Sequence, residues 1–229
     1  MICRRFAPSQ NPEKLCRTKE EKKMEVKNVI FAHGKTPEVT FAPKTIDELI
    51  GHGLDKDEIV IPNFPTKIGK QNVFYDHGWT KVFDELEQNG YLNKNAVLVA
   101  HSLGNVASLK YISENDIKLG KFVSVAGADF ANDANKGIYR FLLKTLGFKL
   151  NETNFEKANQ LAGSRHAVFS KGGDSYASEE AYKNFANKLN ADKLTLPERY
   201  EHLNAKAGNG GKVCPYLANI ILDIPLRDK

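Results

Sequence analysis

The sequence predicts an α/β protein with a three-layer, doubly wound arrangement, in which helices cover both faces of a mostly parallel sheet. Two observations indicate this fold. Apolar runs of strand length alternate along the chain with longer segments of helical periodicity. The strand-like runs are continuously apolar, which is typical of parallel strands that are buried on both faces. The alternation therefore predicts a series of βαβ units.

The individual elements can be placed from residue 28 onward. We expect strands at the apolar runs 28–33, 58–62, 96–101, 121–127, 166–170 and 193–196. We expect helices from Thr45, which can form a capping box with Glu48, around Trp79, directly after Ser102, and behind an N-cap at Ser178. Functional residues should follow strands directly, because ligands bind at the carboxyl ends of the strands in such sheets.

Length and composition fit one ordinary globular domain. The chain has 229 residues, of which 41% are hydrophobic and 27% charged. We expect a flexible basic leader at 1–24, with Met24 as an alternative start, and a single domain at 25–229. Four of the five net positive charges lie before Met24, so no basic face for nucleic acid is indicated in the domain. The leader lacks an apolar run that could be a signal peptide or a membrane span.

The cysteines favour a reducing compartment. Two of the three, Cys3 and Cys16, lie in the leader, and together with Cys214 they have no metal-binding spacing. No dinucleotide-binding glycine fingerprint is present either. We therefore expect a cytoplasmic protein, a monomer or small homo-oligomer, that needs no metal or cofactor.

Ser102 is the candidate nucleophile. It lies in AHSLG, between the third strand and the helix that follows, at a sharp turn. A nucleophile elbow needs small residues two positions before and after the serine, and Ala100 and Gly104 occupy them. The alternative reading is that Ser102 only caps the helix.

A nucleophilic serine needs a base and an acid that orients the base. His202 is the candidate base, because it alone among the histidines lies in a late polar loop after the last strand. Asp174 is the candidate acid, after the strand 166–170 and the pair Gly172-Gly173. Asp129, after the strand 121–127, is its rival.

Two backbone N–H groups are expected to stabilise the oxyanion. One belongs to Leu103, directly after the serine, and the other to Lys35 in the His33-Gly34-Lys35 loop after the first strand.

The order Ser102, Asp174, His202 is the order of the α/β-hydrolase superfamily. From about residue 28 onward the chain resembles that superfamily. Within it, PNFP, HGWTKVFDELE, AHSLGN and YEHLN resemble the small serine hydrolases related to retinoblastoma-binding protein 9. The resemblance implies a Ser102–Asp174–His202 triad that hydrolyses esters or amides. The family often has Asp-Pro at the acid and Gly-His at the base, where this chain has Asp174-Ser175 and Glu201-His202.

The expected function is therefore hydrolysis of a carboxylic ester, or of a small amide, through an acyl-enzyme on Ser102. The apolar segment at about 130–162 is either a small helical cap over an acyl pocket or simply a cover for the sheet. Two other functions stay open: a binding protein that kept the fold without turnover, and an acyltransferase or lyase on the same scaffold.

Overall fold

A six-stranded parallel sheet forms the centre of the protein. The computed structural model describes residues 25–34, 42–65, 78–129, 154–174, 176–197, 203 and 210–225. The strands run in the order β2-β1-β3-β4-β5-β6, and each pair of neighbours is parallel. Their bounds are β1 Asn28–Ala32, β2 Ile59–Val60, β3 Ala96–His101, β4 Leu119–Val125, β5 Ala162–Ser170 and β6 Asp192–Leu196.

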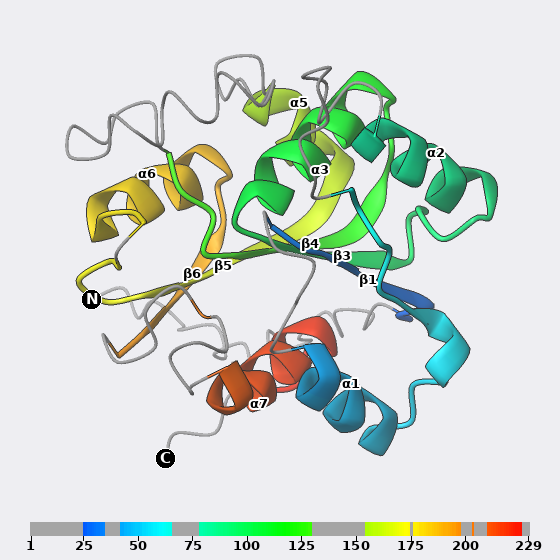
Figure 1. The fold of residues 1–229 in the computed structure, drawn as a ribbon, viewed down its shortest axis with the longest axis horizontal. Helices are drawn as coiled ribbons and strands as arrows, with labels where there is room; N and C mark the ends of the chain where they lie inside the picture. The colour runs from blue at the N-terminus through cyan, green and yellow to red at the C-terminus, as the bar shows by residue number, and fades with distance from the viewer. Residues whose placement is uncertain are drawn as a thin grey trace, which may run out of the picture.

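Helices cover both faces of this sheet, which makes three layers (Figure 1). On one face lie α1 (Ala42–Gly51) and α7 (Gly210–Ile221), which pack against each other. On the other face lie α2 (Thr80–Gln88), α3 (Leu103–Glu114), α5 (Phe155–Leu161) and α6 (Glu179–Lys188). A short 3-10 turn, η2 (Lys56–Glu58), leads into β2. The predicted fold class is confirmed.

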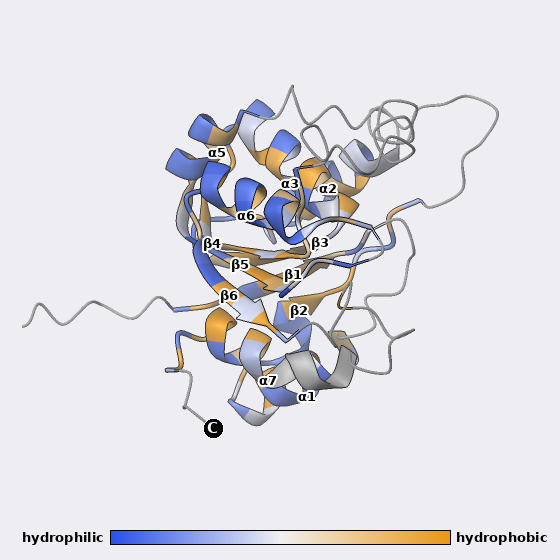
Figure 2. Ribbon diagram, turned by 90° about the vertical axis from the view of Figure 1, so that its left-hand side faces the viewer, coloured by the Kyte–Doolittle hydropathy of each residue, from blue (hydrophilic) through white to orange (hydrophobic). Residues whose placement is uncertain are grey.

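The core lies along the central strands. All six residues of β3 are buried, as are four of the five in β1. Figure 2 shows the central strands in the hydrophobic colour between the two helical layers. Continuous apolar strands are required here because helices remove both faces of the sheet from water.

The strand order changes direction at β1 and β3. From β1 the chain moves to β2 on one side, and from β3 it moves through β4 and β5 to β6 on the other. The connection after β1 leads to α1 on one face, whereas β3 leads to α3 on the opposite face (Figure 1). The two strands are neighbours, with Ala32 paired to Ala100. Connections that diverge to opposite faces open a crevice at the carboxyl ends of the two strands, where ligands bind in open α/β sheets.

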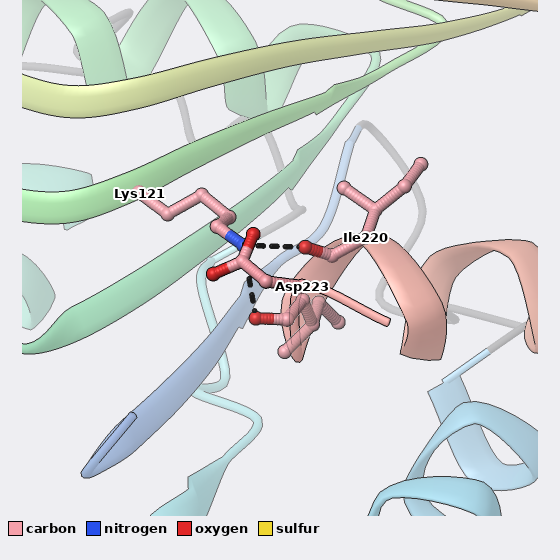
Figure 3. Close-up of polar contacts among 4 residues, drawn as sticks. Lys121, Ile220 and Asp223 are labelled. Atoms are coloured by element: carbon pink, nitrogen blue, oxygen red, sulfur yellow. Dashed lines mark hydrogen bonds and ion pairs between the residues drawn. The ribbon is translucent and has the colours of Figure 1, made fainter. Parts of the chain in front are cut away.

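A buried lysine on β4 holds the end of α7. The side chain of Lys121 is 1% exposed, and its Nζ lies 2.5 Å from Asp223 Oδ1 (Figure 3). The ammonium also donates to the carbonyl oxygens of Ile220 at 2.5 Å and Ile221 at 3.1 Å. A cation at this position satisfies the terminal carbonyls and complements the negative end of the helix dipole.

Several expected boundaries need correction. The helix expected from Thr45 begins at Ala42, so Thr45 is a buried residue inside α1 and not its cap. Strand β5 begins at Ala162, four residues before His166, and β2 has only two residues. Helix α7 was not expected at all. The leader 1–24 and most of the segment 130–162 lie outside the described residues.

No helix in the described ranges combines the length and the apolar character needed to cross a membrane.

Candidate active site

Ser102 lies on the turn from β3 into α3 with an unusual backbone conformation. Its φ is 51° and its ψ is −119°. A side chain at positive φ is strained, and strain of this kind is characteristic of nucleophile elbows. Ser102 is also the only partly exposed residue between Ala96 and Leu109. The turn thus presents one serine at the surface of an otherwise buried strand and helix.

The side chain of Ser102 does not cap α3. Ser102 occupies the N-cap position, but its side chain makes no capping hydrogen bond to the first turn. An ordinary N-cap serine has φ and ψ in the extended region and accepts from the backbone two or three residues ahead. Ser178 does both at the start of α6, with a φ of −73° and a bond from Ala181 N. The contrast argues against the helix-cap reading of Ser102.

Two glycines let the backbone approach the serine closely. A β-carbon at Gly104 would lie 2.6 Å from the carbonyl oxygens of both Ala32 and His33, so only glycine fits between α3 and the end of β1. A β-carbon at Gly34 would lie 2.9 Å from Cβ of Ser102. The loop after β1 is therefore in direct contact with the serine, as the predicted oxyanion site requires.

Asn105 braces the same turn, and the sequence analysis did not single it out. Its side chain is completely buried, and Nδ2 donates to the carbonyl oxygens of Ser102 and Val125, both at 3.1 Å. The backbone N–H of Ser102 donates to the same Val125 oxygen at 3.0 Å. These bonds tie the strained turn to the end of β4. The sequence offered one sign of this role, namely an asparagine in the first turn of an otherwise apolar helix, where a buried amide needs hydrogen-bond partners.

His33 organises the loop after β1. Its Nε2 accepts from the backbone N–H of Phe64 at 3.1 Å, so Nδ1 carries the proton and donates to the carbonyl oxygen of Gly34 at 2.8 Å. Burial lowers the pKa of His33, which keeps the ring neutral in this arrangement. His33 thereby links the loop after β1 to the loop after β2, and both of its ring nitrogens are engaged by backbone groups.

Asp174 follows β5 in a loop that begins with two glycines at positive φ, Gly172 at 80° and Gly173 at 79°. Its Oδ1 accepts from the backbone N–H groups of Tyr176 at 2.6 Å and Ala177 at 2.8 Å. Its Oδ2 accepts from the phenol of Tyr182. Three donors therefore fix the orientation of this carboxylate.

Asp129, the rival acid, is engaged elsewhere. Its side chain is 1% exposed, and Oδ2 forms an ion pair with Lys188 Nζ at 2.6 Å. Its backbone N–H donates to the carbonyl oxygen of Ala181. Asp129 thus connects the end of β4 to α6, and Lys188 compensates its charge.

The structure places Ser102 and Asp174 at the same edge of the sheet. Ser102 and Asp174 both follow the carboxyl ends of parallel strands, β3 and β5, with β4 between them. Leu103 is the first residue of α3, where N–H groups precede the helical hydrogen-bond ladder. His202 and Lys35 lie outside the described residues, although Leu203, next to His202, is described and fully buried. Within the described ranges, no three His, Cys, Asp or Glu side chains gather as a metal site would require.

Solved structures of other proteins share this architecture. The ydeN gene product from B. subtilis is 21% identical and matches over 87% of this chain and 98% of its own, with a TM-score of 0.67. An extracellular α/β-hydrolase from a Paenibacillus species is 12% identical over 83% of this chain and 97% of its own, with a TM-score of 0.60. Esterase RhEst1 from Rhodococcus sp. ECU1013 is 11% identical over 87% and 92%, with a TM-score of 0.57.

At these identities the likeness shows the fold alone, and it confirms the α/β-hydrolase fold expected from the sequence. A search among curated proteins found no significant match. A family model described as serine hydrolase matches residues 76–212, which is more than half of the chain and includes Ser102. The chain therefore belongs to the serine hydrolase family.

Proposed function

We propose that the protein hydrolyses a small carboxylic ester through an acyl-enzyme on Ser102. The observation that carries the proposal is the strained, partly exposed serine, with φ of 51°, held between Gly34, Gly104 and Asn105. A strained conformation costs on the order of 1–3 kcal/mol, so it persists only where the surroundings enforce it. A catalytic role for Ser102 accounts for this cost, because the strained turn presents the hydroxyl to a substrate. A binding protein that has lost turnover would have no need of it.

In the proposed reaction, Ser102 Oγ attacks the acyl carbon while its proton passes to the imidazole of His202. The tetrahedral intermediate collapses, the C–O bond to the alcohol breaks, and the imidazolium returns the proton to the departing alcohol. A water molecule, deprotonated by the same imidazole, then attacks the acyl-enzyme. The bond between Ser102 Oγ and the acyl carbon breaks, the imidazolium returns the proton to Oγ, and the acid is released. The N–H groups of Leu103 and Lys35 would stabilise the oxyanion in both steps.

Asp174 is the proposed acid. A carboxylate in this role must stay ionised and hold the imidazole in one tautomer. Three donors to Asp174 fix the plane of its carboxyl group. Asp129 is less suited, because the ammonium of Lys188 already compensates its charge.

The proposed substrate is a small acyl ester. In support of an ester substrate, one of the structural neighbours is the esterase RhEst1. The scarcity of cysteine favours a cytoplasmic enzyme. We also propose that it is a monomer or a small homo-oligomer, and that the segment 130–162 is a cap over the acyl group.

Hydrolysis of p-nitrophenyl acetate tests the assignment. Ser102→Ala should lower kcat by at least about a thousandfold while circular dichroism stays unchanged. Asp174→Asn should be impaired by up to about ten-thousandfold, the value that the corresponding change produces in a serine protease. Asp129→Asn serves as the matched control and should be nearly as active as the wild type. The reverse ranking of the two aspartates would transfer the acid role to Asp129, and full activity of Ser102→Ala would refute the proposal.

A further inference from the structure

Tyr182 is a buried residue of α6 whose hydroxyl lies on the proposed acid. Its side chain has no exposed surface, and its phenol donates to Oδ2 of Asp174. The ring stacks on Phe169 of β5, with centroids 5.8 Å apart and planes inclined by 20°. The sequence analysis did not single out Tyr182.

The three donors to Asp174 come from two parts of the structure, the loop of Asp174 itself and helix α6. The N–H groups of Tyr176 and Ala177 belong to the same loop as Asp174 and move with it. The phenol of Tyr182 comes from a helix that is capped by Ser178 and packed on the sheet. Among the donors described, it is the one that fixes the carboxylate relative to the rigid scaffold.

Rotation of the carboxylate is what this bond controls. The carboxylate can turn only about its Cα–Cβ and Cβ–Cγ bonds. The two bonds to Oδ1 limit these rotations relative to the loop, whereas the bond from Tyr182 to Oδ2 limits them relative to α6. An acid that orients an imidazole must present an oxygen in one direction, because a small misplacement of a catalytic group lowers the rate by orders of magnitude.

We infer that Tyr182 is a positioning residue, which holds Oδ2 of the proposed acid Asp174 in one direction. The inference rests on the proposed function, since the direction of this carboxylate matters to turnover only if Asp174 serves Ser102 and His202. Tyr182 touches no substrate in this role and acts only through Asp174.

The variant Tyr182→Phe removes the hydroxyl and keeps the ring that packs on Phe169. With p-nitrophenyl acetate, we expect kcat to fall ten- to hundredfold, which corresponds to about 1.4–2.7 kcal/mol in the barrier at 1.36 kcal/mol per factor of ten. We expect KM to stay within twofold of the wild-type value, because the interaction acts on the chemical step.

Tyr111→Phe is the matched control. Tyr111 is 1% exposed, and its phenol also donates to carboxylates, those of Asp84 at 2.8 Å and Glu87 at 2.9 Å. It lies on α3, eight residues after Leu103, and its hydroxyl contacts α2. The control removes the same atom from a similar environment and should leave kcat within twofold of the wild type.

A second comparison separates positioning from general stability. In the Asp174→Asn background the carboxylate is absent, so Tyr182→Phe should change kcat by less than twofold. A hydroxyl that merely stabilised the fold would lower the rate by the same factor in both backgrounds. Rates are measured at 25 °C and expressed per folded molecule from circular dichroism.

The outcomes distinguish this inference from the proposed function. If the wild type turns over through Ser102 but Tyr182→Phe is equally active, the inference is overturned and the proposed function stands. An equal loss in both backgrounds, or a Tyr182→Phe protein that is unfolded at 25 °C, also overturns the inference, since the hydroxyl would then serve folding. If the wild type shows no turnover that depends on Ser102, the proposed function fails, and the inference fails with it.

Discussion

Replacing Gly104 with alanine should destabilise the protein, because the new methyl group has no space. Its β-carbon would lie 2.6 Å from the carbonyl oxygens of Ala32 and His33. A carbon and a carbonyl oxygen ordinarily approach to about 3.3 Å, so α3 and the end of β1 would have to separate by roughly 0.7 Å. Both obstacles are backbone atoms, which cannot rotate away as the end of a flexible side chain could.

Overpacking of this kind costs about 1–3 kcal/mol, and we expect the upper half of that range because two backbone groups are involved. For a chain of this size, each kcal/mol lowers the melting temperature by about 2–4 °C, so Gly104→Ala should melt roughly 4–12 °C below the wild type. The separation also shifts Ser102 relative to Gly34, so ester hydrolysis should fall as well.

Differential scanning calorimetry measures the effect, and Gly51→Ala is the matched control. Gly51 ends α1, and a β-carbon there would meet no atom within 4 Å. This control should be neutral or up to about 1 kcal/mol more stable, because alanine is the better helix former. A Gly104→Ala protein that melts with the wild type and keeps its activity would refute the close approach of α3 to β1.

Two further predictions concern the face of α1 and α7. Lys121→Met should lower the free energy of unfolding by about 2–3 kcal/mol in urea titration, because the carbonyl of Ile220 and the carboxylate of Asp223 lose a buried charged donor. The exposed Lys183→Met is its control, with a change below about 0.5 kcal/mol expected, and equal effects would contradict the account. The pKa of His166 lies below its ordinary value of 6.5, mainly because the side chain is buried and secondly because of the positive charge of Lys121. The folded state therefore binds a proton less readily than the unfolded state. The wild type should therefore lose stability as the pH falls below about 6.5, and His166→Asn should reduce that loss; an unchanged slope between pH 7 and 5 would speak against it.

Local signals account for what the sequence predicted well. The strand β3 and the start of α3 were predicted at their observed bounds, because a continuous apolar run meets the pattern Ala100-x-Ser102-x-Gly104 within a few residues. The resemblance to relatives of retinoblastoma-binding protein 9 led to the serine hydrolase family, which is confirmed, and the narrower relationship stays a prediction.

Features that depend on distant residues were missed. Helix α7 begins with two glycines and contains Pro215, which favour a loop, whereas its end is held by Lys121 about a hundred positions earlier. A lysine inside β4 gives no local sign that it is buried against a helix terminus. The bond between Tyr182 and Asp174 spans only eight positions, but it depends on how the loop turns at Gly172 and Gly173, and this path could not be predicted from the sequence.

Helix α1 was placed too late for a different reason. Thr45 and Glu48 resemble a capping box, but Pro43 lies just after Ala42, and proline is well tolerated in the first turn of a helix. The proline was the better signal, since the observed helix begins at Ala42 and Thr45 is buried within it.

A fluorophosphonate probe tests directly whether Ser102 is an activated nucleophile. The probe phosphonylates activated serines rapidly, and trypsin would release Ser102 in the peptide 95–110, where fragmentation separates it from Ser108. We expect one adduct, on Ser102, that forms in the folded wild type and is lost in Ser102→Ala and after denaturation. A folded protein that stays unlabelled, or that carries its adduct on another serine, would contradict the assignment of Ser102 as the nucleophile.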